Sequence, residues 1–219
     1  MRHPEQAAAI ALLGVDAVGV IGVRASPRFL ALERRRDLFS AVAAAEPSCL
    51  GVVVVADPLD QDMKELEVNR GHQVVQLHGD ESPERCGELR ERLGVSLWKA
   101  IRIRNPDDLE HARAYEPVVD ALLLDAWVPD QLGGTGHAIP TGWLTNFKPA
   151  LPWWLAGGIT PARLPRLMSE LQPDGIDCSS GVETSPGEKD LNKVKELLNI
   201  LKEFKDKRYA SCPRPIPAV

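Results

Sequence analysis

The chain has 219 residues, a length that fits one domain and approaches the ~250 residues typical of a closed parallel barrel. Hydrophobic residues make up 44% and charged residues 26%, a composition that excludes overall disorder. The formal net charge of −5 argues against a nucleic-acid partner, because phosphate backbones require a basic face.

Seven short runs rich in Val, Ile and Leu alternate with longer amphipathic segments, which is the pattern of buried parallel strands and their crossover helices. The runs cover residues 17–22, 50–56, 74–79, 97–103, 121–126, 152–158 and 175–180. Each run predicts one strand, and the spacing leaves room for one helix between strands. These repeated βα units predict either a closed barrel or an open doubly wound sheet.

Helix start signals lie in the segments between the strands. Proline follows a residue suited to helix capping in Asp57-Pro58, Ser82-Pro83, Asn105-Pro106 and Thr160-Pro161. The first two of these helices are expected to end near Gly71 and Gly94. The basic cluster of residues 34–36 lies where another helix begins, and we interpret it as a solvated helical face.

The first βα unit is incomplete in this chain. A predicted helix from Pro4 to Leu13 ends at Gly14, and no strand precedes it, whereas a closed barrel needs eight strands. We therefore expect an α/β fold of the (βα)8 TIM-barrel type, with strand 1 missing and seven strands visible. Residues 1–206 are expected to form this single domain, and residues 207–219 a proline-rich tail.

Parallel α/β folds place their active sites at the carboxyl ends of the strands. The last two predicted strands end in residues 156–161 and 177–183, two turns that contain glycine and can present backbone N–H groups to an anion. This pair of turns predicts a phosphate site, although such glycines can also serve only to make tight turns. The candidate residues are Gly157, Gly158, Ser179, Ser180 and Gly181.

Three other side chains follow strand ends. Asp125 ends an apolar strand, where a partly desolvated carboxyl can exchange a proton or can simply cap the next loop. His78 would face the same mouth as a ligand contact, but a lone histidine is more often structural. Arg28 follows the first visible strand, where a guanidinium can grip a carboxylate; without context, an ordinary surface arginine is the simpler interpretation.

The loop after Asp125 contains Gly133-Gly134-Thr135-Gly136 and is long enough to fold over a ligand, so both a lid and a plain linker stay open. The four cysteines, at positions 49, 86, 178 and 212, show no CxxC or Cys/His pairing. They indicate neither a zinc site nor a disulfide framework. With no signal-peptide pattern and no apolar stretch of ~20 residues, we expect a cytoplasmic protein without a membrane partner.

Seven segments, in this order, resemble phosphoribosylanthranilate isomerase, the barrel enzyme of tryptophan biosynthesis. They are GVDAVGVIG (14–22), SPRF (26–29), VVQLHG (74–79), LLLD (122–125), GGTG (133–136), LAGGITP (155–161) and DCSSGVE (177–183). Each motif is weak alone, but seven in register are specific. The resemblance spans residues 4 to about 205.

The resemblance implies an Amadori rearrangement without a metal or organic cofactor, in which N-(5-phosphoribosyl)anthranilate becomes 1-(2-carboxyphenylamino)-1-deoxyribulose 5-phosphate. In family terms Asp125 matches the general acid, Arg28 the carboxylate clamp and His78 a substrate contact. Asp177 matches a substrate-binding residue beside the phosphate turns. The implied partner is a small phosphorylated molecule, and the protein would be a monomer or a homodimer.

The sequence departs from the family at its start, where the general base is a cysteine in a Lys-Ile-Cys-Gly-type first strand. Cys178 is the nearest candidate substitute, but strand alternation would turn it towards the helices if Asp177 faces the mouth. One hypothesis is therefore the isomerase, and a second is a catalytically impaired barrel that keeps only phosphate and carboxylate binding. Another phosphosugar barrel enzyme fits less well, because the expected catalytic lysines or metal ligands are missing.

Overall fold

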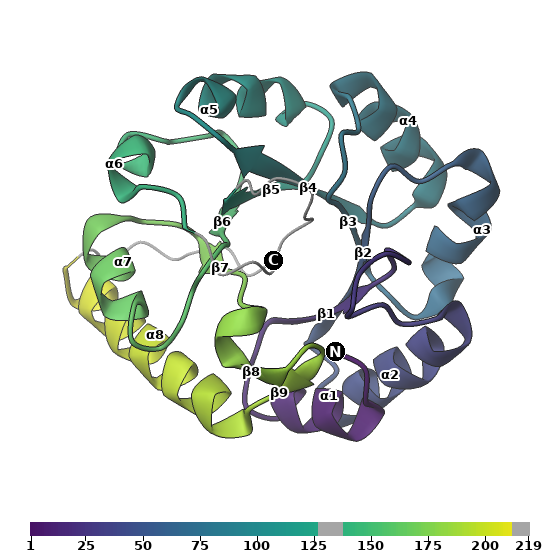
Figure 1. The fold of residues 1–219 in the computed structure, drawn as a ribbon, viewed down its shortest axis with the longest axis horizontal. Helices are drawn as coiled ribbons and strands as arrows, with labels where there is room; N and C mark the ends of the chain where they lie inside the picture. The colour runs from purple at the N-terminus through teal and green to yellow at the C-terminus, as the bar shows by residue number, and fades with distance from the viewer. Residues whose placement is uncertain (127–137, 212–219) are drawn as a thin grey trace.

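The computed structural model describes residues 1–126 and 138–211, and seven parallel strands form its main sheet. All seven predicted strands are present. They are β1 (Ala17–Ile21), β2 (Leu50–Val55), β3 (Val74–Leu77), β4 (Ser96–Ile103), β5 (Ala121–Ala126), β6 (Trp153–Leu155) and β7 (Gly175–Ile176). Neighbours in the chain are neighbours in the sheet, and the strands curl into a ring with the helices outside (Figure 1).

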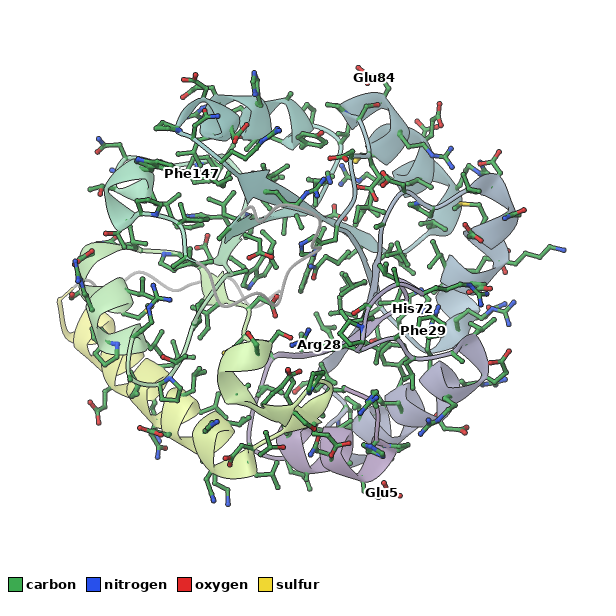
Figure 2. All side chains as sticks on the ribbon, in the orientation of Figure 1. Glu5, Arg28, Phe29, His72, Glu84 and Phe147 are labelled. Carbon is green, nitrogen blue, oxygen red and sulfur yellow. The ribbon has the colours of Figure 1, made fainter. Side chains whose placement is uncertain are left out.

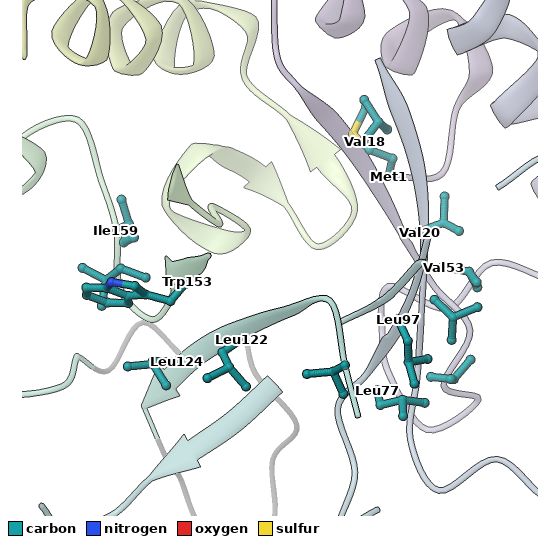
Figure 3. Close-up of a cluster of buried hydrophobic side chains, with 14 of the residues drawn as sticks. Met1, Val18, Val20, Val53, Leu77, Leu97, Leu122, Leu124, Trp153 and Ile159 are labelled. Atoms are coloured by element: carbon teal, nitrogen blue, oxygen red, sulfur yellow. The ribbon is translucent and has the colours of Figure 1, made fainter. Parts of the chain in front are cut away.

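Alternating side chains divide each strand between two environments. Outward-facing residues such as Val53, Leu97 and Leu122 pack in the large core beneath the helices (Figure 3). Inside the ring, Trp98 of β4 stacks on Trp154 of β6, with ring centroids 4.3 Å apart. Large side chains therefore fill the inside of the ring below the carboxyl ends of the strands.

The helices are α1 (Pro4–Ala11), α2 (Leu32–Ala45), α3 (Met63–Leu66), α4 (Pro83–Leu93), α5 (Asp107–Ala112), α6 (Thr141–Leu144), α7 (Leu164–Glu170) and α8 (Leu191–Ser211). The predicted start of α4 is confirmed, because the Ser82 hydroxyl accepts a hydrogen bond from the Arg85 amide. Gly94, with φ of 63°, ends this helix as expected.

Three local predictions are wrong. The helix expected directly behind Thr160-Pro161 begins only at Leu164, after a turn over residues 161–163. The helix expected directly behind Asp57 begins only at Asp60, because Asp57 adopts a left-handed conformation and its carboxylate accepts the Asp80 amide instead. The cluster of residues 34–36 is not wholly solvated, since Arg35 is only 4% exposed. Its Nε donates to the Leu30 carbonyl, because its position on α2 faces the core together with the apolar residues of that helix.

The sheet does not close between its first and last strands. β1 and β7 are the two ends of the sheet, and no ladder joins them among the described strands. We call the space between them the seam. A hairpin of β8 (Glu183–Ser185) and β9 (Glu188–Lys189) lies beside α1 near the seam (Figure 1). The Gln6 side chain bonds both main-chain groups of Lys189, and the Met1 amino group donates to the Gly19 carbonyl of β1.

The carboxyl-terminal helix extends into the segment expected to be a tail. Because α8 reaches Ser211, residues 207–211 are helical, and 212–219 lie outside the described residues. The glycine loop of residues 133–136 also lies outside them. None of the described helices is long and apolar enough to cross a membrane.

Candidate active site

A small pocket lies at the carboxyl ends of β5, β6 and β7. Its lining combines two carboxylates with the backbone of two turns: Asp125, Ala156, Gly157, Gly158, Ile159, Asp177, Ser179, Ser180 and Gly181. The structure thus brings together seven of the nine residues singled out from the sequence. The other two, His78 and Arg28, lie on the β3 and β1 sides of the mouth.

The turns after β6 and β7 require glycine. Gly157 and Gly158 have φ of 86° and 59°, in the left-handed region that other residues rarely adopt. At Gly181 a Cβ atom would lie 1.7 Å from the Ile159 carbonyl oxygen, so the two turns touch backbone to backbone. Among the described residues, no protein acceptor is bonded to the amides of Gly158, Ser180 and Gly181, which leaves them available to an anion.

Two cations hold the carbonyl side of these turns. Arg163 Nη1 donates to the Gly158 carbonyl at 2.5 Å, and Lys189 Nζ donates to the Ser179 carbonyl at 2.9 Å. A free carbonyl oxygen would repel an anion, and in both contacts this oxygen is instead bonded to a cationic side chain. The turns therefore combine free N–H groups with nearby positive charge, the combination that suits a phosphate.

Asp125 is 4% exposed and is fixed at the end of β5 by two neighbours. Its Oδ1 accepts the Ala126 amide at 2.8 Å, and its Oδ2 lies 3.4 Å from His78 Nε2. The Gln76 amide nitrogen lies 3.2 Å from His78 Nδ1, on the other side of the ring. His78 Nε2 is buried and has no hydrogen-bond partner among the described residues.

Asp177, beyond the end of β7, is the second carboxylate of the pocket. Asp177 is exposed at the mouth of the ring, where it lines the pocket. Incomplete hydration, and then the charge of Asp125, raise the pKa of Asp177.

Arg28 makes a bidentate ion pair with Glu183 of β8. Its Nε lies 3.0 and 3.1 Å from the two carboxylate oxygens, and its Nη2 lies 2.8 Å from Oε2. Figure 2 shows Arg28 on the inner side of the ring next to β1. Burial by itself would raise the pKa of Glu183, but hydrogen bonds from Arg28 and the charge of Lys189 outweigh it and lower the pKa to about 2. The predicted carboxylate grip is thus already in contact with a carboxylate of the protein.

The described cysteines are protonated thiols. Burial raises the pKa of Cys49 to about 11 and the pKa values of Cys86 and Cys178 to about 12. Cys178 Sγ donates to the Ile159 carbonyl at 3.0 Å and does not line the pocket, as strand alternation indicated. None of these three thiols is therefore suited to abstract a proton. Cys212 lies outside the described residues.

Sequence reasoning missed four polar residues of the mouth: Gln76, Arg102, Glu183 and Lys189. Two of them could have been predicted from their positions in the strands. Gln76 stands two residues before His78 in one strand and so shares its face, and Arg102 is in register with Asp125 on the neighbouring strand. Arg102 is ion-paired with Asp80. The described residues contain no group of three or more His, Cys, Asp or Glu that could hold a metal ion.

The profile of the N-(5'-phosphoribosyl)anthranilate (PRA) isomerase family matches residues 1–200. The N-(5'-phosphoribosyl)anthranilate isomerase of Synechococcus sp. (strain JA-3-3Ab) is 46% identical over 216 residues, covering 98% of this chain and 94% of the relative. The crystal structure of the Thermotoga maritima isomerase has a TM-score of 0.82 at 26% identity, covering 93% and 96% of the two chains. A PRA isomerase in complex with reduced 1-(o-carboxyphenylamino)-1-deoxyribulose 5-phosphate has a TM-score of 0.76 at 26% identity, covering 93% and 95%.

Proposed function

Because the chain belongs to the N-(5'-phosphoribosyl)anthranilate isomerase family and acts as this isomerase in tryptophan biosynthesis, we propose that its reaction takes place in the pocket at the ends of β5, β6 and β7. The observation that carries this proposal is the presence of two carboxyl groups and two glycine turns in one pocket. A phosphorylated sugar whose ring oxygen must accept a proton needs both an acid and an anion site within its own length.

Asp125 is the proposed general acid. A proton given to the ribose ring oxygen lets the C1–O bond break, and loss of the C2 proton to a base then yields the enolamine that becomes the ketose. The position of His78 supports this role, since its Nε2 lies 3.4 Å from Asp125 Oδ2 and has no hydrogen-bond partner among the described residues. Asp177, on the opposite side of the pocket, is the proposed partner for the sugar hydroxyls.

Phosphate is proposed to bind at Gly157, Gly158, Ser179, Ser180 and Gly181. The free amides and the cations Arg163 and Lys189 behind the turns support this assignment. The solved family member that holds the reduced product binds a 5-phosphate compound, and we propose the same compound as the probe for this chain. Arg28 is the proposed contact for the carboxylate at the other end of that compound.

The general base is proposed to stand on an eighth strand seated in the seam, which would complete a (βα)8 barrel. The resemblance implies a cysteine in a Lys-Ile-Cys-Gly-type strand. Two observations support this proposal: β1 and β7 have no ladder between them, and the three described cysteines are thiols of raised pKa. The base is thus separable from the acid, which lies on a strand that is paired on both sides, whereas the second anion turn follows β7 at the edge of the seam.

The Thermotoga maritima isomerase is dimeric. We propose that this chain is a monomer or a homodimer acting in the cytoplasm, where the free thiols of its described cysteines would stay reduced.

Titration calorimetry with reduced 1-(o-carboxyphenylamino)-1-deoxyribulose 5-phosphate tests the proposed site. We expect binding that inorganic phosphate weakens by competition. In NMR spectra both ligands should shift the amides of Gly157, Gly158, Ser180 and Gly181 first, because phosphate is common to the two. Shifts confined to other regions, or no binding of the reduced product, would contradict the assignment.

A further inference from the structure

Within the described residues, the guanidinium of Arg28 forms hydrogen bonds along only one of its edges. Nε and Nη2 both bond the Glu183 carboxylate, and the Arg28 side chain is 14% exposed. A guanidinium has five N–H groups in a rigid plane, so the edge that contains Nη1 stays free for a second acceptor. One carboxylate bound along one edge therefore fixes the direction in which the other edge points.

Glu183 is held much more firmly than a surface carboxylate. Its side chain is 5% exposed, and its Oε1 accepts hydrogen bonds from Lys189 Nζ and the Gly187 amide, both at 3.1 Å. If a ligand displaced it from Arg28, a buried charge would lose its bidentate partner, which is costly. A substrate carboxylate is therefore expected to add to the free edge of Arg28 and to leave the Glu183 pair intact.

We propose that Glu183 is a positioning residue that orients Arg28 for the carboxylate of the substrate. This inference rests on the proposed role of Arg28 in the isomerase reaction. Glu183 itself touches no reacting atom; it acts by keeping the guanidinium plane in one orientation, so that less conformational freedom is lost when the substrate binds.

The same contacts connect the two ends of the substrate site. Lys189 Nζ bonds both Glu183 and the Ser179 carbonyl of the phosphate turn. Glu183 also follows directly after the 3₁₀ turn Ser180–Val182. The orientation of Arg28 is thus set relative to the phosphate turn. Because Arg28, Glu183, Lys189 and the turn are connected by hydrogen bonds, the spacing between the two anion-binding groups is fixed, and it should match the distance between the two anionic ends of the substrate.

Binding measurements with two ligands test this inference. The first is reduced 1-(o-carboxyphenylamino)-1-deoxyribulose 5-phosphate, and the second is the same molecule with a phenyl group in place of the carboxyphenyl group. We expect Glu183→Gln to weaken the first ligand roughly 10-fold and the second less than about 2-fold, because only the first uses the free edge of Arg28. Equal weakening of both ligands would show a general structural role and overturn the inference.

Two further variants separate this inference from the role of Arg28. If Arg28→Ala leaves the preference for the carboxylate ligand unchanged, the proposed carboxylate clamp is wrong. If Arg28→Ala removes the preference but Glu183→Gln does not, only the positioning inference fails. In the Arg28→Ala background, Glu183→Gln should cause no additional selective loss.

Glu183→Asp keeps the test decisive if Glu183→Gln does not fold. The shorter side chain retains the charge beside Lys189 but cannot reach both nitrogens of Arg28 in the same geometry. We expect a selective loss for the carboxylate ligand that is smaller than that of Glu183→Gln. An Asp variant whose affinity for both ligands equals that of the unchanged chain would count against orientation as the role of Glu183.

Discussion

Two regions of the ring are held together in different ways. In the arc formed by β2 to β5, each strand bonds its neighbours along the backbone, and β4 and β5 stay in register from Trp98 to Ile103. At the seam between β7 and β1, side chains make the connections instead, through the Arg28–Glu183–Lys189 cluster and the contacts of Gln6 with Lys189. Backbone pairing tolerates changes of side chain, whereas the seam depends on individual charged groups.

This difference has a chemical counterpart. The proposed acid Asp125 and the first anion turn follow β5 and β6, which are paired on both sides, whereas the second anion turn follows β7 at the edge of the seam. The proposed base belongs to the seam. We therefore expect the proposed acid to be held in its working geometry by the paired strands. The position of the proposed base is expected to depend on the strand that fills the seam.

Filling the seam should produce the largest effect. We expect a chain extended at its start by a Lys-Ile-Cys-Gly-type strand to be ~10²–10⁴-fold more active as an isomerase than residues 1–219 alone. This factor is the usual contribution of one positioned base. A steady-state assay of product formation measures it. The same extension with Ala in place of Cys is the matched control and should restore the sheet without this gain in activity. Comparable activity with and without the Cys-containing strand would place the base within residues 1–219.

Removing the proposed acid should have the next largest effect. In the extended chain, Asp125→Asn should lower kcat by roughly 10²–10⁴-fold and leave binding of the reduced product nearly unchanged, because the amide cannot supply the proton. Stopped-flow and titration measurements separate the two quantities. Asp107→Asn in the first turn of α5 is the control on an exposed carboxylate. Near-normal turnover in Asp125→Asn would remove this residue from the role.

The arc contains a buried Lys–Glu ion pair, and breaking it should cost stability rather than chemistry. Lys99 Nζ bonds Glu81 Oε2 at 2.8 Å, with both side chains at most 2% exposed, and Glu81 also accepts the amides of Asp57 and Gly79. We expect Lys99→Met to lower the free energy of unfolding by about 3–5 kcal/mol, since it leaves a buried carboxylate without its cation. Urea unfolding measures this difference.

The matched control for Lys99 is the exposed pair of Arg166 with Glu170 on α7. The Arg166 side chain is 80% exposed, so Arg166→Met should change the free energy of unfolding by less than about 1 kcal/mol. Equal effects of the two substitutions would mean that burial does not govern the strength of these pairs.

How far the sequence predicts this molecule also differs between the two regions. In the arc, apolar runs and Ser82 with Gly94 around α4 are local signals, and the strands and that helix appear where they were expected. The seam was not predictable in the same way, because Arg28 and Glu183 are 155 positions apart and no local pattern links them. The β8–β9 hairpin was likewise missed, as its strands span three and two residues and give no alternating pattern.

The smallest expected effect concerns the acid sensitivity of the seam. The pKa of Glu183 lies at about 2 in the folded protein, below its ordinary value of 4.5. A depressed carboxyl pKa adds stability that is fully present above the unfolded value and is lost as the pH falls towards the folded one. Glu183 should therefore contribute about 1–3 kcal/mol above pH ~5, and this contribution should disappear between pH ~4.5 and ~2.

Glu183→Gln separates this contribution from the other carboxyl groups of the chain. The free energy of unfolding of this variant, measured in urea at several pH values, should fall less steeply between pH 5 and 3 than that of the unchanged chain, because Gln does not titrate. Glu188→Gln is the control: Glu188 belongs to the same hairpin, but its side chain is 36% exposed in its pair with His3. The Glu188→Gln variant should leave the slope nearly unchanged.

If both variants flatten the pH dependence equally, the sensitivity belongs to the hairpin as a whole and not to the buried pair of Glu183 with Arg28. If neither does, the seam is held mainly by contacts that do not titrate, such as those of Gln6 with the Lys189 main chain, and the contrast between the seam and the arc would then rest on geometry rather than charge.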